Sequence, residues 1–145
     1  MKALICNEFG STKNLTLEEV KSPEPGAGQV LIDVHAAGIN FPDVLTVQGK
    51  YQFKPSLPFT PGIEVSGVIK KVGKDVKMRK VGDEVISTLQ TGAFASEVVT
   101  SENSTFLKGN MSFEQAAGFA LTYGTSYYAL KQRARLVAGE TVLVL

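Results

Sequence analysis

The stretch QVLIDVHAAGI, residues 29–39, gives the clearest indication of the fold. Every second side chain from Val30 to Ala36 is apolar, whereas Asp33 and His35 lie on the opposite side of an extended chain. A period of two residues is typical of a strand with one buried face. This stretch therefore predicts a β-strand that lies over a hydrophobic core.

Other segments on both sides of this stretch have strand patterns, and tight turns separate them. Further strands are predicted at 2–6, 14–20, 64–73, 83–89 and 93–100, with 14–20 as an edge strand. The stretches SPEPGAG (22–28) and PFTPG (58–62) predict turns, because proline fixes φ and glycine allows positive φ. Residues 1–111 are therefore predicted to form a mainly β module.

Residues 40–49 interrupt this pattern and predict a short helix. Asn40 is a favoured N-cap residue, and Pro42 is tolerated in a first helical turn. Asp43 complements the positive end of the helix dipole, and Gly49 can end the helix.

The pattern changes again near residue 111, where we predict a module boundary. Ser112 and Gln115 form a possible capping box, and 122–134 reads as a helix with Tyr123 and Tyr127 on one face. The last seven residues, GETVLVL (139–145), then predict a turn and a strand buried on both faces. The overall class is α+β, mainly β, with a second part over 112–145 that resembles the start of a doubly wound α/β domain.

Composition excludes several classes of function. Fifteen Lys and Arg residues balance 14 Asp and Glu residues, for a formal net charge of +1, so nothing indicates nucleic acid or an anionic membrane as a partner. One cysteine cannot form an intramolecular disulfide, and one cysteine with one histidine cannot complete a protein zinc site. No signal peptide and no membrane-length apolar run is recognisable, which predicts a cytoplasmic protein.

Four polar residues are candidates for a site, although each also has a structural interpretation. Asn40 is an N-cap, Asp43 is a first-turn acid, Tyr51 can pack beside Phe53, and Thr125 lies in a predicted helix. Residue chemistry alone favours the structural interpretation for all four.

Three further residues are expected to be structural. His35 is expected to be a surface or packing residue, and Cys6 a small buried apolar residue in the first strand. Glu64 stands before an apolar strand, and a carboxylate entering a core requires a partner. We therefore expect Glu64 to form a buried ion pair with a basic residue that the sequence does not identify.

Several stretches, in order along the whole chain, resemble one family. They are AAGINFPDVLTVQGKY (36–51), PFTPGIEVSGVI (58–69), VGDEV (81–85), GAFASEVV (92–99), and TYGTSYYAL with LVAGETVLVL (within 122–145). Together they are similar to the quinone oxidoreductase branch of the medium-chain dehydrogenase/reductase superfamily, which includes zeta-crystallin. Zinc-dependent alcohol dehydrogenases of that superfamily have a cysteine ligand where this chain has Asn40 and a histidine ligand where it has Ile63, so the resemblance implies an enzyme without zinc.

The resemblance implies a GroES-like, partly open β-barrel over 1–111, followed by the start of a Rossmann domain. In the family, a strand like that at 139–145 leads directly into a glycine-rich pyrophosphate loop. We therefore expect the chain to be an N-terminal fragment that is inactive alone, with the full-length protein a homodimer that binds NADPH.

The same resemblance implies a function for the candidate residues. Relatives place the residues that match Asn40, Asp43, Tyr51 and Thr125 around the nicotinamide end of NADPH. Tyr51 would orient the acceptor, and the expected activity is NADPH-dependent reduction of a quinone. Two alternatives stay open: reduction of the C=C bond of an electrophilic alkene (an enal, enone or enoyl thioester), and a non-enzymatic GroES-like interaction module.

Overall fold

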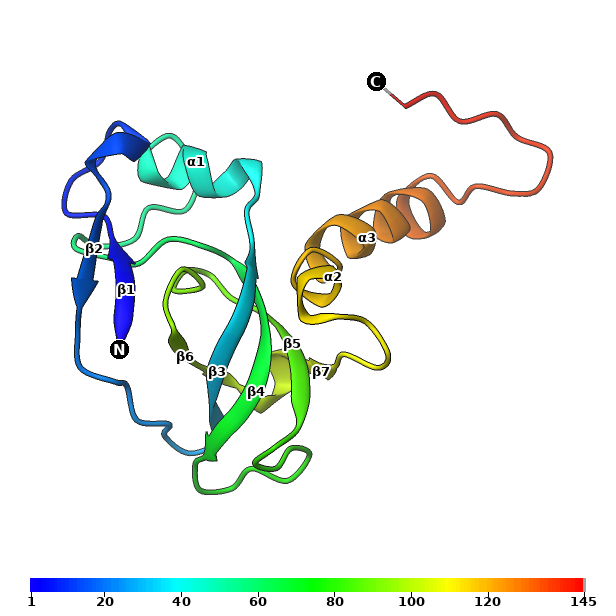
Figure 1. The fold of residues 1–145 in the computed structure, drawn as a ribbon. Coiled ribbons are helices and arrows are strands. Elements are labelled where there is room, and N and C mark those ends of the chain that lie inside the picture. Colours follow the sequence, from blue (N-terminus) through cyan, green and yellow to red (C-terminus); the bar gives the residue numbers. More distant parts are fainter. Residues whose placement is uncertain (145) are drawn as a thin grey trace.

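A computed structural model of the chain describes residues 1–144. Two antiparallel sheets make up most of it (Figure 1), and short helices lie at their ends. The strands are β1 (Lys2–Ile5), β2 (Thr16–Glu19), β3 (Gln29–Gly38), β4 (Glu64–Val72), β5 (Glu84–Thr88), β6 (Glu97–Ser101) and β7 (Thr105–Leu107). The helices are α1 (Phe41–Val47), α2 (Phe113–Ala117) and α3 (Ala120–Tyr127), with a π-helical continuation, η3, at Tyr128–Arg133 and single 3₁₀ turns, η1 and η2, at Thr12–Asn14 and Glu102–Ser104.

The larger sheet has the strand order β6-β3-β4-β5-β7 and is open, with β6 and β7 as its edges. The side chains that alternate along these strands meet in one hydrophobic core, whose fully buried members include Val30, Ile32, Val65, Ile69 and Val85. This core confirms the strand prediction made from residues 29–39. The mainly β fold with few short helices is thereby confirmed.

The smaller sheet, β1-β2, covers a second core under helix α1. Cys6, Val47 and Phe59 are buried together there, with Leu15 packed against them. Backbone hydrogen bonds between Cys6 and Phe59, and from Leu4 to the carbonyl of Phe94, fasten this sheet to the loops of the larger one. Helix α1 is therefore held at a fixed position above one end of β3.

The pairing of β3 with β4 is irregular at two points, where the register shifts between Leu31 and Ile32 and between Val34 and Ala36. After the second shift, Gly38 pairs with Glu64 at the end of β3 that leads into α1. A methyl group on Gly38 would overlap the Glu64 carboxylate and lie 2.6 Å from the carbonyl oxygen of Ala117. Only glycine allows β3, Glu64 and the end of α2 to approach so closely.

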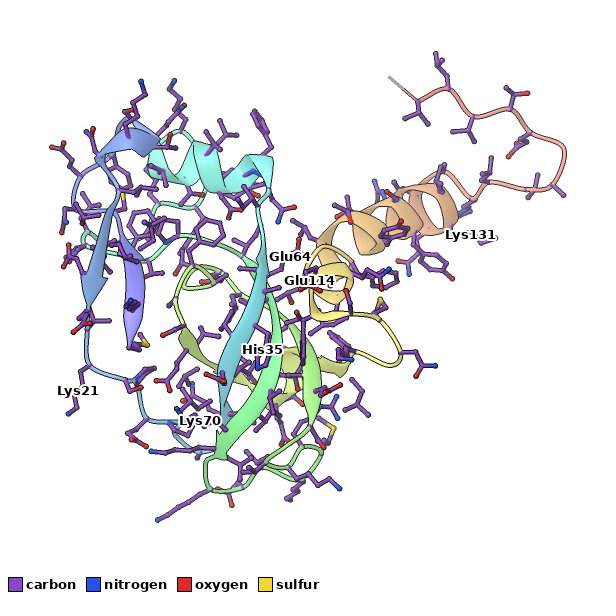
Figure 2. All side chains as sticks on the ribbon, viewed as in Figure 1. Lys21, His35, Glu64, Lys70, Glu114 and Lys131 are labelled. Carbon is purple, nitrogen blue, oxygen red and sulfur yellow. The ribbon has the colours of Figure 1, made fainter. Side chains whose placement is uncertain are left out.

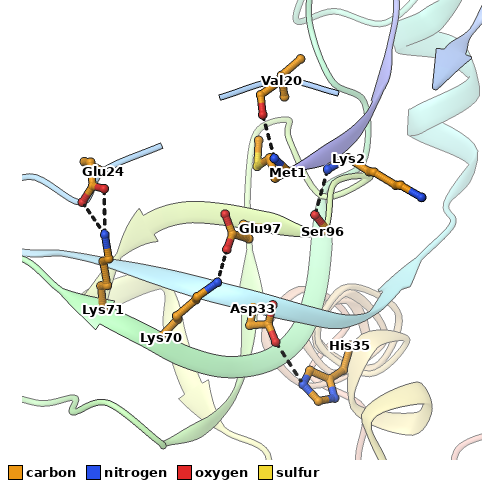
Figure 3. Close-up of polar contacts among 10 residues, drawn as sticks. All are labelled: Met1, Lys2, Val20, Glu24, Asp33, His35, Lys70, Lys71, Ser96 and Glu97. Carbon is orange, nitrogen blue, oxygen red and sulfur yellow. Dashed lines mark hydrogen bonds and ion pairs between the residues drawn. The ribbon is translucent and has the colours of Figure 1, made fainter. Parts of the chain in front are cut away.

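Several polar side chains of the larger sheet form pairs with one another or with a neighbouring loop (Figure 3). Lys70 pairs with Glu97, and Lys71 pairs with Glu24 at 2.8 Å. His35 Nε2 lies 3.7 Å from an Asp33 carboxylate oxygen. None of these residues lines the cleft described below.

Helix α2 packs on the sheet, whereas α3 extends away from it (Figure 1). The Ser66 hydroxyl donates to the carbonyl of Phe113, and the Phe113 ring lies 4.3 Å from the ring of His35. Beyond Phe119, the helix formed by α3 and η3 has no buried residue. His35 is thus a partly exposed packing residue, as expected.

Three details differ from the sequence-based expectations. Strand β7 was not predicted, because its three residues are too few to show a period. The predicted helix at 122–134 is longer at its start and ends in a π-helical turn. The strand predicted at 139–145 is not formed over 139–144, and Leu145 lies outside the described residues. A strand needs a hydrogen-bonded neighbour, and no described strand pairs with this segment.

No helix within residues 1–144 has the length and apolarity that crossing a lipid bilayer requires.

Candidate functional site

A cleft of about 530 Å³ lies between the start of α1 and the first turns of α3. Three of the four candidate residues, Asn40, Tyr51 and Thr125, line it together. The other lining residues are Phe41, Pro42, Leu121, Thr122 and Ser126. None of the lining side chains carries a charge, and several can hydrogen-bond, so the cleft suits a neutral, hydrogen-bonding group.

Asn40 is placed by the end of β3 and the start of α1. It is the N-cap of α1, and its backbone N–H donates to Asp43 Oδ2 at 2.7 Å, while the N–H of Asp43 donates to the Asn40 carbonyl at 3.0 Å. This local pairing confirms the N-cap prediction. It leaves the Asn40 side chain free of the cap, so that its amide lies at the wall of the cleft.

Tyr51 reaches the cleft because helix α1 ends in a left-handed turn. Gly49 has φ of +67°, and the N–H groups of Lys50 and Tyr51 both donate to the carbonyl of Leu45. The positive φ explains why glycine stands at this position. The turn reverses the chain and brings Tyr51 back beside the N-terminus of α1.

Thr125 belongs to the opposite wall, on α3. The hydroxyls of its neighbours are already used, since Thr122 Oγ1 donates to the Gly118 carbonyl at 2.6 Å and Ser126 Oγ donates to the Thr122 carbonyl at 2.9 Å. Within residues 1–144, the Thr125 hydroxyl has no such bond and stays available to a ligand.

Glu64 lies behind the cleft and is 1% exposed. The expectation that it forms an ion pair with a basic residue is wrong. Its Oε1 accepts a hydrogen bond from Asn40 Nδ2 at 2.9 Å, and its Oε2 accepts one from the Leu121 backbone N–H at 3.1 Å. Figure 2 shows Glu64 where β4 meets the C-terminal helices. Neutral donors from two distant segments therefore satisfy this buried carboxylate.

Asp43 is the one candidate that does not line the cleft. It is 3% exposed, and its Oδ1 is buried without a hydrogen-bond partner among the described residues. Burial raises the pKa of Asp43, the hydrogen bond from Asn40 opposes that rise, and the nearby Glu64 carboxylate adds to it. Asp43 supports the turn at Asn40 from behind.

Cys6 lies in the second core, 1% exposed, on the far side of α1 from the cleft. Burial raises the pKa of its thiol. The interpretation of Cys6 as a small buried residue is confirmed.

The described residues offer donors for a nicotinamide more readily than ligands for a metal. Within residues 1–144, no three His, Cys, Asp or Glu side chains gather closely enough to hold a metal ion. The amide of Asn40 and the hydroxyls of Tyr51 and Thr125 match the donors and acceptors of a carboxamide in an uncharged cleft. The residues present therefore fit the nicotinamide end of a dinucleotide.

Sequence reasoning did not identify the role of Glu64 or the lining role of Leu121, Thr122 and Ser126. The pairing of Glu64 with Asn40 and Leu121 spans 24 and 57 residues and leaves no local pattern. The spacing of Thr122 and Ser126 is a weak signal, because residues four apart share a helix face.

The chain matches the family of alcohol dehydrogenase GroES-like domains over residues 26–139, and it belongs to that family. A quinone oxidoreductase-like protein 2 homolog from Nematostella vectensis is 44% identical over 146 residues, which are 99% of this chain and 40% of that protein. The predicted relation to quinone oxidoreductases is thereby confirmed. The chain spans less than half the length of this relative.

The fold of the chain is also similar to those of two solved structures. Escherichia coli quinone oxidoreductase complexed with NADPH is 30% identical, with a TM-score of 0.85 over 92% of this chain and 41% of that chain. The CurK enoyl reductase is 34% identical, with a TM-score of 0.87 over 96% of this chain and 45% of that chain. The family is thus one of oxidoreductases.

Proposed function

We propose that this chain is the catalytic-domain part of a zinc-independent, NADPH-dependent quinone oxidoreductase. The observation that supports this most is the uncharged cleft in which Asn40, Tyr51 and Thr125 converge from three separate segments. Similarity to a quinone oxidoreductase complexed with NADPH supports the choice of cofactor. In this proposal Asn40, a neutral amide that is not a strong metal ligand, stands beside the reacting groups.

In the proposed enzyme, each residue of the cleft has a separate task. Asn40 and Thr125 hydrogen-bond the carboxamide and fix the orientation of the nicotinamide ring. Tyr51 donates a hydrogen bond to a quinone oxygen, where negative charge develops during reduction. NADPH, when bound, supplies the reducing equivalents, and the chain supplies position and a water-poor surface. Asp43 stays behind the wall and holds the turn that carries Asn40.

The proposal extends to the whole protein. The relatives are longer than this chain, and we propose that the pyrophosphate of NADPH is bound by a part that follows residue 145. On this view, residues 1–111 are the catalytic domain and residues 112–145 lead into the nucleotide-binding domain. The 145-residue chain alone would have no turnover, and the complete protein would be a cytoplasmic homodimer.

The test is NADPH oxidation by the complete protein encoded by the gene, with a quinone as acceptor. Asn40→Ala and Thr125→Val should raise the KM for NADPH, and Tyr51→Phe should lower kcat with little change in that KM. Thr16→Val is the matched control, because Thr16 is an exposed residue of β2 that does not line the cleft. Unchanged kinetics in all three site variants would refute the assignment of this cleft.

A second candidate is reduction of the C=C bond of an enone or enoyl thioester. The 34% identity to the CurK enoyl reductase favours it, since the same cleft would serve both acceptors. An activity panel of quinones and enoyl thioesters on the complete protein distinguishes the two. A higher kcat/KM for the thioesters would replace the quinone assignment and leave the cofactor assignment in place.

A further inference from the structure

We propose that Glu64 is a positioning residue that joins both walls of the cleft and turns the carbonyl oxygen of Asn40 toward the ligand. The cleft would then select a ligand group that donates an N–H. This selection rests on the proposed function, whereas the positioning itself is a property of the chain alone.

The two oxygens of Glu64 reach two different walls. Oε1 accepts from Asn40 Nδ2, where β3 passes into α1, and Oε2 accepts from the backbone N–H of Leu121 in the first turn of α3. Both donors belong to residues that line the cleft. The first turn of a helix has N–H groups without helical partners, so Leu121 has a donor to give. One buried side chain thus fixes the spacing of the two walls.

An ionised carboxylate accepts hydrogen bonds and donates none. Asn40 must therefore present its NH₂ to Glu64, which leaves its carbonyl oxygen for the cleft. The neighbouring carboxyl, Asp43, makes its own hydrogen bond to the backbone N–H of Asn40 and does not compete for the Asn40 side chain. The hydrogen bond to Glu64, which does not line the cleft, then fixes which end of the Asn40 amide faces the ligand.

A glutamine could not replace Glu64 in this task. It has one acceptor and one NH₂ group, so accepting from Leu121 would leave only its NH₂ to face Asn40. The Asn40 amide would turn over to offer its oxygen to this donor, and its NH₂ would face the cleft. The absence of a side chain on Gly38, which pairs with Glu64, keeps the space that the carboxylate occupies. The arrangement therefore depends on a carboxylate at 64 and a glycine at 38.

Hydrogen exchange on the isotope-labelled 145-residue chain tests the positioning without any ligand. In the wild type, the side-chain NH₂ of Asn40 and the backbone N–H of Leu121 should both exchange slowly. Glu64→Gln should speed exchange of the Asn40 NH₂ and leave Leu121 protected, whereas Glu64→Ala should release both. Glu97→Gln is the matched control, because Glu97 is also buried but pairs with Lys70 away from the cleft.

Rapid exchange of the Asn40 NH₂ in the wild type would overturn the proposal whether or not the variants fold. Continued protection of Asn40 in a folded Glu64→Gln protein would overturn it as well.

The ligand part is tested in the complete protein with NADPH and its acetylpyridine analogue, in which a methyl group replaces the carboxamide NH₂. The wild type should bind NADPH about tenfold more tightly, the value of one hydrogen bond, and Glu64→Gln should remove most of this preference. An unchanged preference in the variant would refute the selection. If neither nucleotide binds the wild type, the proposed function fails, and hydrogen exchange alone decides the positioning.

Discussion

The sheet body and the C-terminal helix of this protein are both rich in apolar residues, but they use them differently. In the body, the alternating side chains of β3, β4 and β5 are fully buried in one core. In the helix formed by α3 and η3, Tyr123 is 65% exposed and Tyr127 is 62% exposed, on the face they share with Phe119 and Leu130. A periodic apolar pattern thus identifies the face of an element that can pack against another, but it does not identify the element that packs there.

The candidate site lies at the junction of these two regions. One wall is carried by β3 and α1, which two cores hold in place. The other wall is the start of α3, which the Glu64 carboxylate and the packing of α2 connect to the sheet. Substitutions in the body should therefore change global stability, while substitutions at the junction should change the cleft.

The largest effect is expected from a substitution in the body. Ile32 is fully buried in the main core, so Ile32→Ala should lower the free energy of unfolding by about 2–5 kcal/mol. Urea denaturation followed by circular dichroism measures this. A loss below about 1 kcal/mol would mean that the core is packed less tightly than the contacts of Ile32 indicate.

A substitution at the junction should have an intermediate effect. Gly38→Ala places a methyl group against Glu64 and the Ala117 carbonyl, and we expect a loss of about 1–3 kcal/mol from this overpacking. Gly118→Ala is the matched control, because a methyl group there would lie 4.0 Å from the Glu114 carbonyl oxygen, an ordinary contact distance. The same denaturation measurement compares them, and equal stabilities would show that Gly38 is not needed for close packing.

A smaller effect should depend on pH. The folded-state pKa of Asp43 is raised above its ordinary value of 3.8, so the folded state binds this proton more tightly than the unfolded state. The Asp43 contribution to stability is therefore greatest below that value and is lost as the pH rises through the folded-state pKa. Asp43→Asn removes the titration, so the wild type should lose stability relative to the variant as the pH rises. Urea denaturation across this range measures the difference, and a constant difference would contradict the raised pKa.

The smallest effect is expected in the C-terminal helix. Tyr127→Ala removes a side chain that is 62% exposed on α3, so the free energy of unfolding should change by less than about 0.5 kcal/mol. Denaturation of this variant beside Ile32→Ala completes the comparison of the two regions. A loss as large as that in the core would show that this face is packed in solution.

Local rules predicted most of the fold. Strand β3 and helix α1 follow from period-two alternation and from the N-cap at Asn40, which depend on neighbours a few residues apart. Strand β7 could not be found in this way, because its pairing with β5 and not its own pattern defines it. The strand expected at 139–145 failed for the related reason that its pairing partners are not among the described strands.

The site was less predictable than the fold. Asn40, Tyr51 and Thr125 were candidates through resemblance, and the structure brings them into one cleft, while their roles stay predictions. The expected ion pair of Glu64 was wrong, because a buried carboxylate needs hydrogen bonds and does not need a cation to provide them. Amide and backbone donors have no distinctive residue signature, so the sequence could not name them.

The burial of Cys6 has a practical consequence. It is the only cysteine of the chain, it lies in the core beneath α1, and its thiol has a raised pKa. A thiol reagent can therefore label the chain only when that core opens. The rate of labelling therefore reports how often the core beneath α1 opens. Fraying of the C-terminal helix would leave this rate unchanged.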